Sequence, residues 1–101
     1  MYVLVRTDLP PAQQAVQSCH ASIEAARQFL EPDAHHPHLV VCGVRGEEAL
    51  HQARDRLEAL GIRCCAFVEP DRDHEVTALA TEPLSGGRRR LLRRFKLLRP
   101  G

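Results

Sequence analysis

Short apolar runs alternate in this chain with longer segments of helical periodicity, and this alternation limits the possible folds more than any other feature. The first run, Tyr2–Thr7, is rich in valine and leucine and is typical of a strand covered on both faces. Pro10 and Pro11 cannot continue a strand, but they suit the first turn of a helix, where a missing backbone N–H costs nothing. We therefore expect a long helix from there to Leu30.

Apolar residues recur along this helix at spacings of three and four, which predicts that one stripe faces the core. The stripe consists of Ala12, Ala15, Val16, Cys19, Ile23, Ala26 and Leu30. A polar stripe lies beside it, made of Gln13, Gln17, His20, Glu24 and Arg27. The spacing alone favours a solvated face for these polar residues over a hydrogen-bonding surface for a substrate.

The other elements follow in the order strand, helix, strand, strand, helix. They are a buried, central strand at 39–44, a helix at Glu47–Leu60 with Gly61 as its left-handed cap, strands at Ile62–Val68 and Val76–Thr81, and a helix at Arg88–Arg94. Two strand–helix–strand units predict a partly parallel sheet with helices on both faces. The short loop before Val76 allows antiparallel pairing there, so we expect an α/β fold with a mixed sheet.

The size and composition fit one globular domain, residues 1–101. A chain of this length has too small a core to divide, and 44% hydrophobic with 27% charged residues excludes a disordered tail. No apolar run approaches the roughly 20 residues that span a bilayer, and the first residues lack a basic leader. We expect a cytoplasmic protein with no membrane partner.

The cysteine and histidine spacings do not indicate a metal site. The four cysteines match no disulfide framework or zinc ribbon, and we expect buried, reduced thiols. They are Cys19, Cys42, Cys64 and Cys65. The three histidines within 35–38 surround a proline and would have difficulty closing a tetrahedral site. We expect no metal and no cofactor.

A loop with the sequence EPDRDHE, residues 69–75, holds four carboxylates. They are Glu69, Asp71, Asp73 and Glu75. Carboxylates that face each other have raised pKa values, and one of them could serve as a general base. The loop lacks the glycine and the closing glutamate of a calcium site. An ordinary hydrophilic turn is the alternative.

The junction between the first strand and the first helix is the other candidate for chemistry. In sheets of this kind, ligands gather beyond the carboxyl ends of the strands, where a helix N-terminus offers free N–H groups. Gln13 and Gln17 stand on the first two turns, and their amides can both donate and accept. We expect these glutamines and the loop at 69–75 to meet at one edge of the sheet in a shared cleft.

Basic residues are concentrated at the end of the chain. Residues 86–101 hold seven of them and no acid, whereas the remainder has seven basic against thirteen acidic residues. They are Arg88, Arg89, Arg90, Arg93, Arg94, Lys96 and Arg99. Arginines in the first turn of a helix oppose its dipole, which indicates a role other than helix stability. Contact with phosphate groups is that role, and a solvated basic helix is the alternative.

Four stretches together resemble one family. VLVRTDL, AQQAVQSCHA, VTALATEP and FKLL occur in the order found in the type II peptidyl-tRNA hydrolases, and the match covers nearly the whole chain. The resemblance implies a three-layer α/β/α sandwich with a four-stranded mixed sheet, often dimeric. It also implies hydrolysis of the ester that joins a peptide to the 3′ ribose of tRNA.

Roles carry over from this family position by position. Gln17 and His20 fall on the family's glutamine and histidine, and Thr77 falls on its second strand-four threonine. Glu69 or Asp71 replaces the family's aspartate. Its lysine position falls on Gln13, so the resemblance indicates a divergent, bacterial-type member that lacks the usual lysine.

The resemblance implies a mechanism and leaves two alternatives open. Glu69 or Asp71, acting through His20, would orient a water, and Gln13 and Gln17 would hold the oxyanion. The segment Arg88–Arg94 would hold the tRNA acceptor stem by its phosphates. The alternatives are an RNA-binding module that lost its chemistry with the lysine, and a hydrolase of another acyl substrate.

Overall fold

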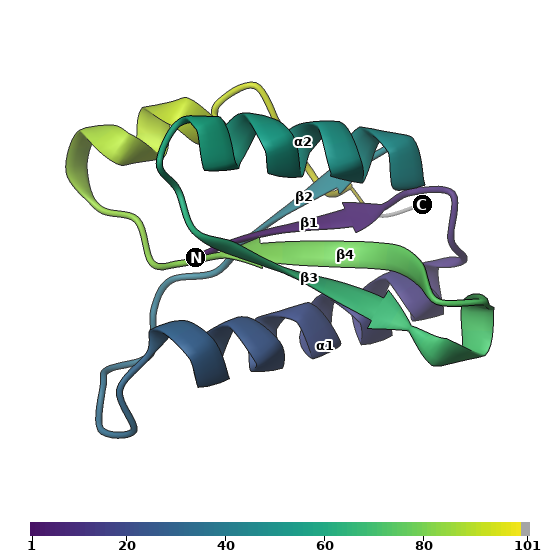
Figure 1. Ribbon diagram of the computed structural model, residues 1–101, viewed down its shortest axis with the longest axis horizontal. Coiled ribbons are helices and arrows are strands. Elements are labelled where there is room, and N and C mark those ends of the chain that lie inside the picture. The colour runs from purple at the N-terminus through teal and green to yellow at the C-terminus, as the bar shows by residue number, and fades with distance from the viewer. Residues whose placement is uncertain (100–101) are drawn as a thin grey trace.

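A mixed five-stranded sheet lies between two long helices (Figure 1). The computed structural model describes residues 1–99, so the last two residues of the expected 1–101 domain lie outside it. The elements are β1 (Tyr2–Arg6), α1 (Pro11–Phe29), β2 (Val40–Val44), α2 (Glu47–Ala59), β3 (Cys64–Glu69), the 3₁₀-helix η1 (Pro70–Arg72), β4 (Glu75–Thr81), the 3₁₀-helix η2 (Gly86–Leu92) and β5 (Lys96–Leu97).

The strand order is β3-β4-β1-β2-β5. β1 and β2 are parallel, β4 is antiparallel to both β1 and β3, and β5 is antiparallel to β2. The mixed sheet and the antiparallel pairing of β3 with β4 are confirmed. The central position expected for 39–44 is wrong, because β2 is the fourth of the five strands and of its residues only Cys42 is fully buried.

The expected four strands become five because the segment after Phe95 is extended. Leu97 pairs with Cys42 and covers the edge of β2, which would otherwise present unpaired backbone groups. The helix expected at Arg88–Arg94 is instead η2, a 3₁₀-helix over Gly86–Leu92. Its successive arginines oppose an α-helical dipole, and Leu92 is its only fully buried residue, which is too little apolar contact to hold a longer helix.

The two α-helices cover opposite faces of the sheet, so the molecule has three layers (Figure 1). Alternate residues of β1 enter different cores. Leu4 packs in the core under α2, with Leu50 and Leu57, and Val3 packs in the core under α1, with Ala21.

The buried face of α1 differs from the predicted one. Val16 is 44% and Ile23 56% exposed. The buried residues are Gln17, Ser18, Ala21 and Ala25. Small side chains let the helix lie close to the sheet, and this close packing outweighs the burial of larger residues that β-branching would hold further away.

The cysteines also differ in part from expectation. Cys42 and Cys65 are buried and Cys64 is half-buried, but Cys19 lies on the exposed side of α1. All four thiols are free, and burial raises the pKa of Cys64 to about 11.

One edge of the sheet gathers the ends that matter for function. β1, β2 and β3 end there, β4 begins there, and α1 and α2 start there. We call this edge the rim and define it by residues 6–14, 44–47 and 69–77. Its position, at the right of Figure 1, brings the loop at 69–75 next to the start of α1.

Candidate functional site

The side chain of Gln17 joins the elements of the rim. It is 1% exposed. Its Oε1 accepts a hydrogen bond from Thr77 Oγ1 at 2.8 Å, and its Nε2 donates to Glu69 Oε2 at 2.8 Å and to Gln13 Oε1 at 3.2 Å. An ionised carboxylate only accepts, so the amide nitrogen must face Glu69. The predicted meeting of the glutamines and the carboxylate loop is confirmed.

Glu69 ends β3 with both carboxylate oxygens engaged. Oε2 accepts from Gln17, and Oε1 accepts from the backbone N–H of Asp71 at 3.2 Å. The hydrogen bond from Gln17, followed by that from Asp71, lowers the pKa of Glu69, and the charges of His20 and Arg72 lower it further. The prediction that crowding would raise the pKa is wrong for Glu69, because donors and cations surround it. Its carboxylate is ionised and fixed in direction.

The other carboxylate considered for catalysis, Asp71, points elsewhere. Only its N–H reaches Glu69, and its side chain is exposed with no hydrogen bond to any of the described residues. The turn that follows is tight: Asp73 and His74 have φ of 53° and 61°, and the N–H of His74 donates to Glu69 O at 3.1 Å. This backbone holds Glu69 at the rim.

His20 lies one turn after Gln17 on α1. Its ring stacks on Phe67 with centroids 4.6 Å apart and planes at 11°. Within residues 1–99 the ring makes no hydrogen bond, so it borders the Gln17–Glu69 pair without bonding to it.

A second cluster of charges lies on the rim, and the sequence reasoning missed it. Arg6 is 6% exposed and donates to both oxygens of Asp8 at 2.9 Å, to Glu75 Oε1 at 2.7 Å and to Val76 O at 3.2 Å. These bonds raise the pKa of Arg6 and lower that of Asp8. An arginine closing an apolar strand was the available signal.

Arg72 stands between the two clusters. Its guanidinium is 3.7 Å from Glu75 Oε1, and its charge contributes to lowering the pKa of both Glu69 and Asp8. Its Nε is buried and has no hydrogen-bond partner among the described residues. The rim therefore holds a cation with unused donor capacity beside the ionised Glu69.

The predicted basic segment does not join this site. β4 runs away from the rim, so η2 lies at the opposite end of the sheet (Figure 1). Arg88 donates to Gly61 O at 3.0 Å and lies 3.7 Å from Glu82. Arg89, Arg90 and Arg93 line a shallow hollow of about 290 Å³. Arg94 lines a different groove, described below.

Among residues 1–99, no three His, Cys, Asp or Glu side chains lie close enough together to hold a metal ion. No helix within the same residues combines the length and the apolar character needed to cross a membrane.

Comparison with known proteins adds a family. The model of the family described as "Peptidyl-tRNA hydrolase PTH2" matches residues 1–98, which is nearly the whole chain. A search of curated proteins found no significant match.

Proposed function

The chain belongs to the peptidyl-tRNA hydrolase PTH2 family, and from that premise we propose that it hydrolyses the ester bond between a peptide, or an N-blocked amino acid, and tRNA. The observation that supports this most directly is the bond between the buried Gln17 and the ionised Glu69 at the rim. It fixes a carboxylate at an exposed edge, where a substrate can reach it.

In the proposed reaction Glu69 acts as the general base. A water held by its carboxylate attacks the ester carbonyl, so that a new C–O bond forms and the bond to the 3′ oxygen of the ribose breaks. The proton taken from the water passes through the carboxylate to the departing 3′ oxygen. Thr77 and Gln17 are positioning residues, because they hold the carboxylate without touching the substrate.

The developing oxyanion needs donors and positive charge. Gln13 presents its oxygen to Gln17, which turns its own Nε2 outward. The start of α1 has no side-chain cap and no acid in its first turn, so its free N–H groups add to the positive potential. The guanidinium of Arg72 supplies a full positive charge. We assign to Arg72 the electrostatic role of the lysine that position 13 lacks.

The test is release of N-acetylated amino acid from N-acetylaminoacyl-tRNA. Glu69→Gln keeps the size of the side chain and removes its basicity, and we expect kcat to fall by about 10²-fold or more. Asp71→Asn is the matched control, because its carboxylate has no partner, and it should retain turnover. Equal loss in both variants, or in neither, contradicts the assignment of Glu69.

A second candidate function is an RNA-binding module without chemistry, favoured by the glutamine at position 13. Wild-type protein that binds tRNA tightly and releases no amino acid would establish it. Turnover of a small acyl ester but not of the tRNA ester would instead support a hydrolase of another substrate.

Three finer points belong to the same proposal. The lysine-free start of α1 marks a divergent, bacterial-type branch, and a tRNA substrate fits a cytoplasmic protein. A homodimer is consistent with the exposure of Ile23, Leu39 and Leu97, each more than half accessible. Light scattering of the purified protein tests the dimer.

A further inference from the structure

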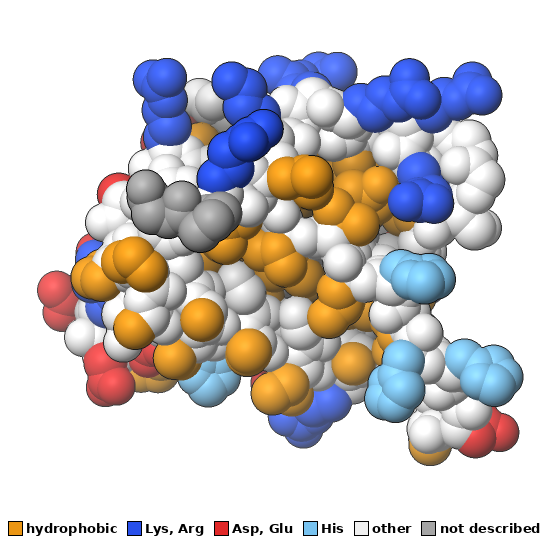
Figure 2. All heavy atoms as spheres, turned by 180° about the vertical axis from the view of Figure 1, so that it is seen from behind, with side chains coloured by type: hydrophobic (Ala, Val, Ile, Leu, Met, Phe, Trp, Pro, Cys, Tyr) orange, Lys and Arg blue, Asp and Glu red, His pale blue; other side chains and the backbone are white. Residues whose placement is uncertain are grey.

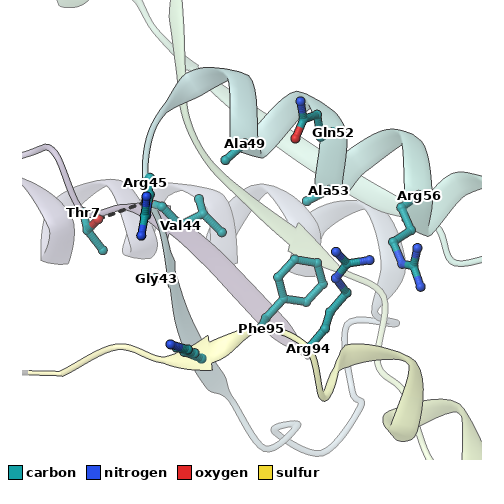
Figure 3. Close-up of a pocket in the computed structure, with 11 residues that line it drawn as sticks. Thr7, Gly43, Val44, Arg45, Ala49, Gln52, Ala53, Arg56, Arg94 and Phe95 are labelled. Carbon is teal, nitrogen blue, oxygen red and sulfur yellow. Dashed lines mark hydrogen bonds between the residues drawn. The ribbon is translucent and has the colours of Figure 1, made fainter.

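A groove on the α2 side of the sheet gathers positive charge from three separate parts of the chain. Arg45 follows β2, Arg56 lies on α2, and Arg94 and Lys96 belong to the C-terminal segment. Figure 3 shows Arg56 extending from α2 and Arg94 from the segment after η2 toward the same opening, with Phe95 beside them. The groove has a volume of about 680 Å³.

These four cations have no counter-charge inside the protein. No carboxylate lines the groove, and within residues 1–99 none of the four forms a salt bridge. Most other arginines outside the C-terminal segment are paired, including Arg54, which is 3.2 Å from Glu58 on the same helix. Figure 2 shows the result on one face: basic side chains gather along the edge on the α2 side, and acidic ones lie mostly away from it.

Such an arrangement costs free energy unless an anion occupies it. Like charges in one concave surface repel each other, and the surrounding walls concentrate their field. Guanidinium groups meet phosphate oxygens in a forked geometry, and Arg45, Arg56 and Arg94 enter from different sides. The walls otherwise consist of small or apolar side chains such as Ala49, Ala53 and Phe95, which offer little to read base edges.

We propose that this groove binds successive phosphate groups of an RNA backbone. The inference rests on the proposed function for the identity of that RNA, the tRNA part of the substrate. Thr7 lines the groove and directly follows Arg6 of the rim. An RNA strand seated in the groove therefore passes the same edge of the sheet that carries Glu69. This site includes Arg94 from the predicted basic segment but depends on Arg45 and Arg56, which lie outside that segment.

The test measures binding of deacylated tRNA by fluorescence anisotropy, which requires no turnover. Arg45→Gln and Arg56→Gln should each weaken binding roughly fivefold and lower the slope of log affinity against log salt by about one. Arg54→Gln is the matched control, because it removes the same charge from α2 at a residue that is paired and lies outside the groove.

The outcomes separate this inference from the proposed function. Weakened binding in the groove variants with an unchanged Arg54→Gln supports the groove, even if the wild-type protein hydrolyses nothing. Equal effects of Arg54→Gln and Arg56→Gln, or full affinity in the double variant Arg45→Gln/Arg56→Gln, overturn it. Thermal unfolding of each variant shows that it is folded, and Lys96→Gln provides a second test if one of them is not.

Discussion

Gln17 shows how one buried polar residue can organise a site. Its amide has no water to bond with, so all of its hydrogen bonds must come from the protein, and it finds them on β4, β3 and α1. Loss of any partner would leave a buried donor or acceptor unsatisfied, which costs about 1–3 kcal/mol. The direction of the Glu69 carboxylate is therefore tied to the packing of the helix on the sheet.

The first prediction concerns the pH dependence that follows from Glu69. Its pKa is lowered below the ordinary value of 4.5, so the carboxylate stays ionised as the pH falls from 7 to 5, and activity is lost only as the pH falls further through the lowered pKa. We expect kcat/KM for N-acetylaminoacyl-tRNA to be flat over that range. A fall around pH 6 to 7, where imidazoles ordinarily titrate, would point to His20 as the base instead.

The second prediction concerns Arg72. Arg72→Gln removes the positive charge beside Glu69, and we expect kcat to fall roughly tenfold or more. Gln13→Lys in that background should restore part of the activity, because position 13 lies within 3.2 Å of the Gln17 amide and a lysine there reaches the same site. The measurement is single-turnover release of N-acetylated amino acid.

Arg72→Lys keeps the charge and serves as the control for this series. An unchanged kcat in Arg72→Gln would remove Arg72 from the mechanism. A loss of thermal stability equal in Arg72→Gln and Arg72→Lys, with equal loss of rate, would assign it a structural role only.

At the scale of elements, the short strand β5 connects the fold to the groove. Its pairing with Cys42 and Gly43 brings Lys96 beside the groove and closes the edge of β2. Gly43 makes this approach possible. A Cβ at position 43 would lie 2.6 Å from Thr7 Cγ2 and 3.3 Å from Leu98 Cδ1.

The third prediction is that Gly43→Ala destabilises the protein by about 1–3 kcal/mol, because the β-branched Thr7 must shift to avoid the new methyl group. Urea unfolding measures this difference. Gly87→Ala is the control, since a Cβ there meets no atom within 4 Å. Equal unfolding midpoints for the two variants would show that the edge relaxes without cost.

At the scale of the whole molecule, charge is divided between the faces. The C-terminal segment is entirely basic, whereas the remaining chain has more acidic than basic residues. The site of the proposed chemistry lies at the rim, and the unpaired cations lie along the α2 side (Figures 2 and 3). Binding of the nucleic acid and cleavage of the ester therefore depend on different residues.

The fourth prediction follows from this division. Raising the salt concentration should reduce kcat/KM for N-acetylaminoacyl-tRNA steeply, by about one unit of logarithmic slope for each phosphate contact. Hydrolysis of a small N-acetylaminoacyl ester that lacks RNA should be insensitive to salt. Parallel curves for the two substrates would contradict separate binding and chemical sites.

The sequence alone determined the alternation of strands and helices, the mixed pairing, the left-handed Gly61 and the meeting of the glutamines with the loop at 69–75. These features depend on local chemistry: apolar periodicity, proline and glycine at the ends of elements, and the rule that parallel strands end at one edge.

The tertiary structure alone decided which face of α1 is buried, which carboxylate meets Gln17, and that FKLL forms a strand. Periodicity shows that two faces of a helix differ, but the buried face is chosen by how closely small side chains pack and by bonds to distant residues such as Thr77. The groove could not be read from the sequence for the same reason. Arg45, Arg56 and Arg94 are far apart along the chain, and only the packing of α2 against the C-terminal segment brings their charges together.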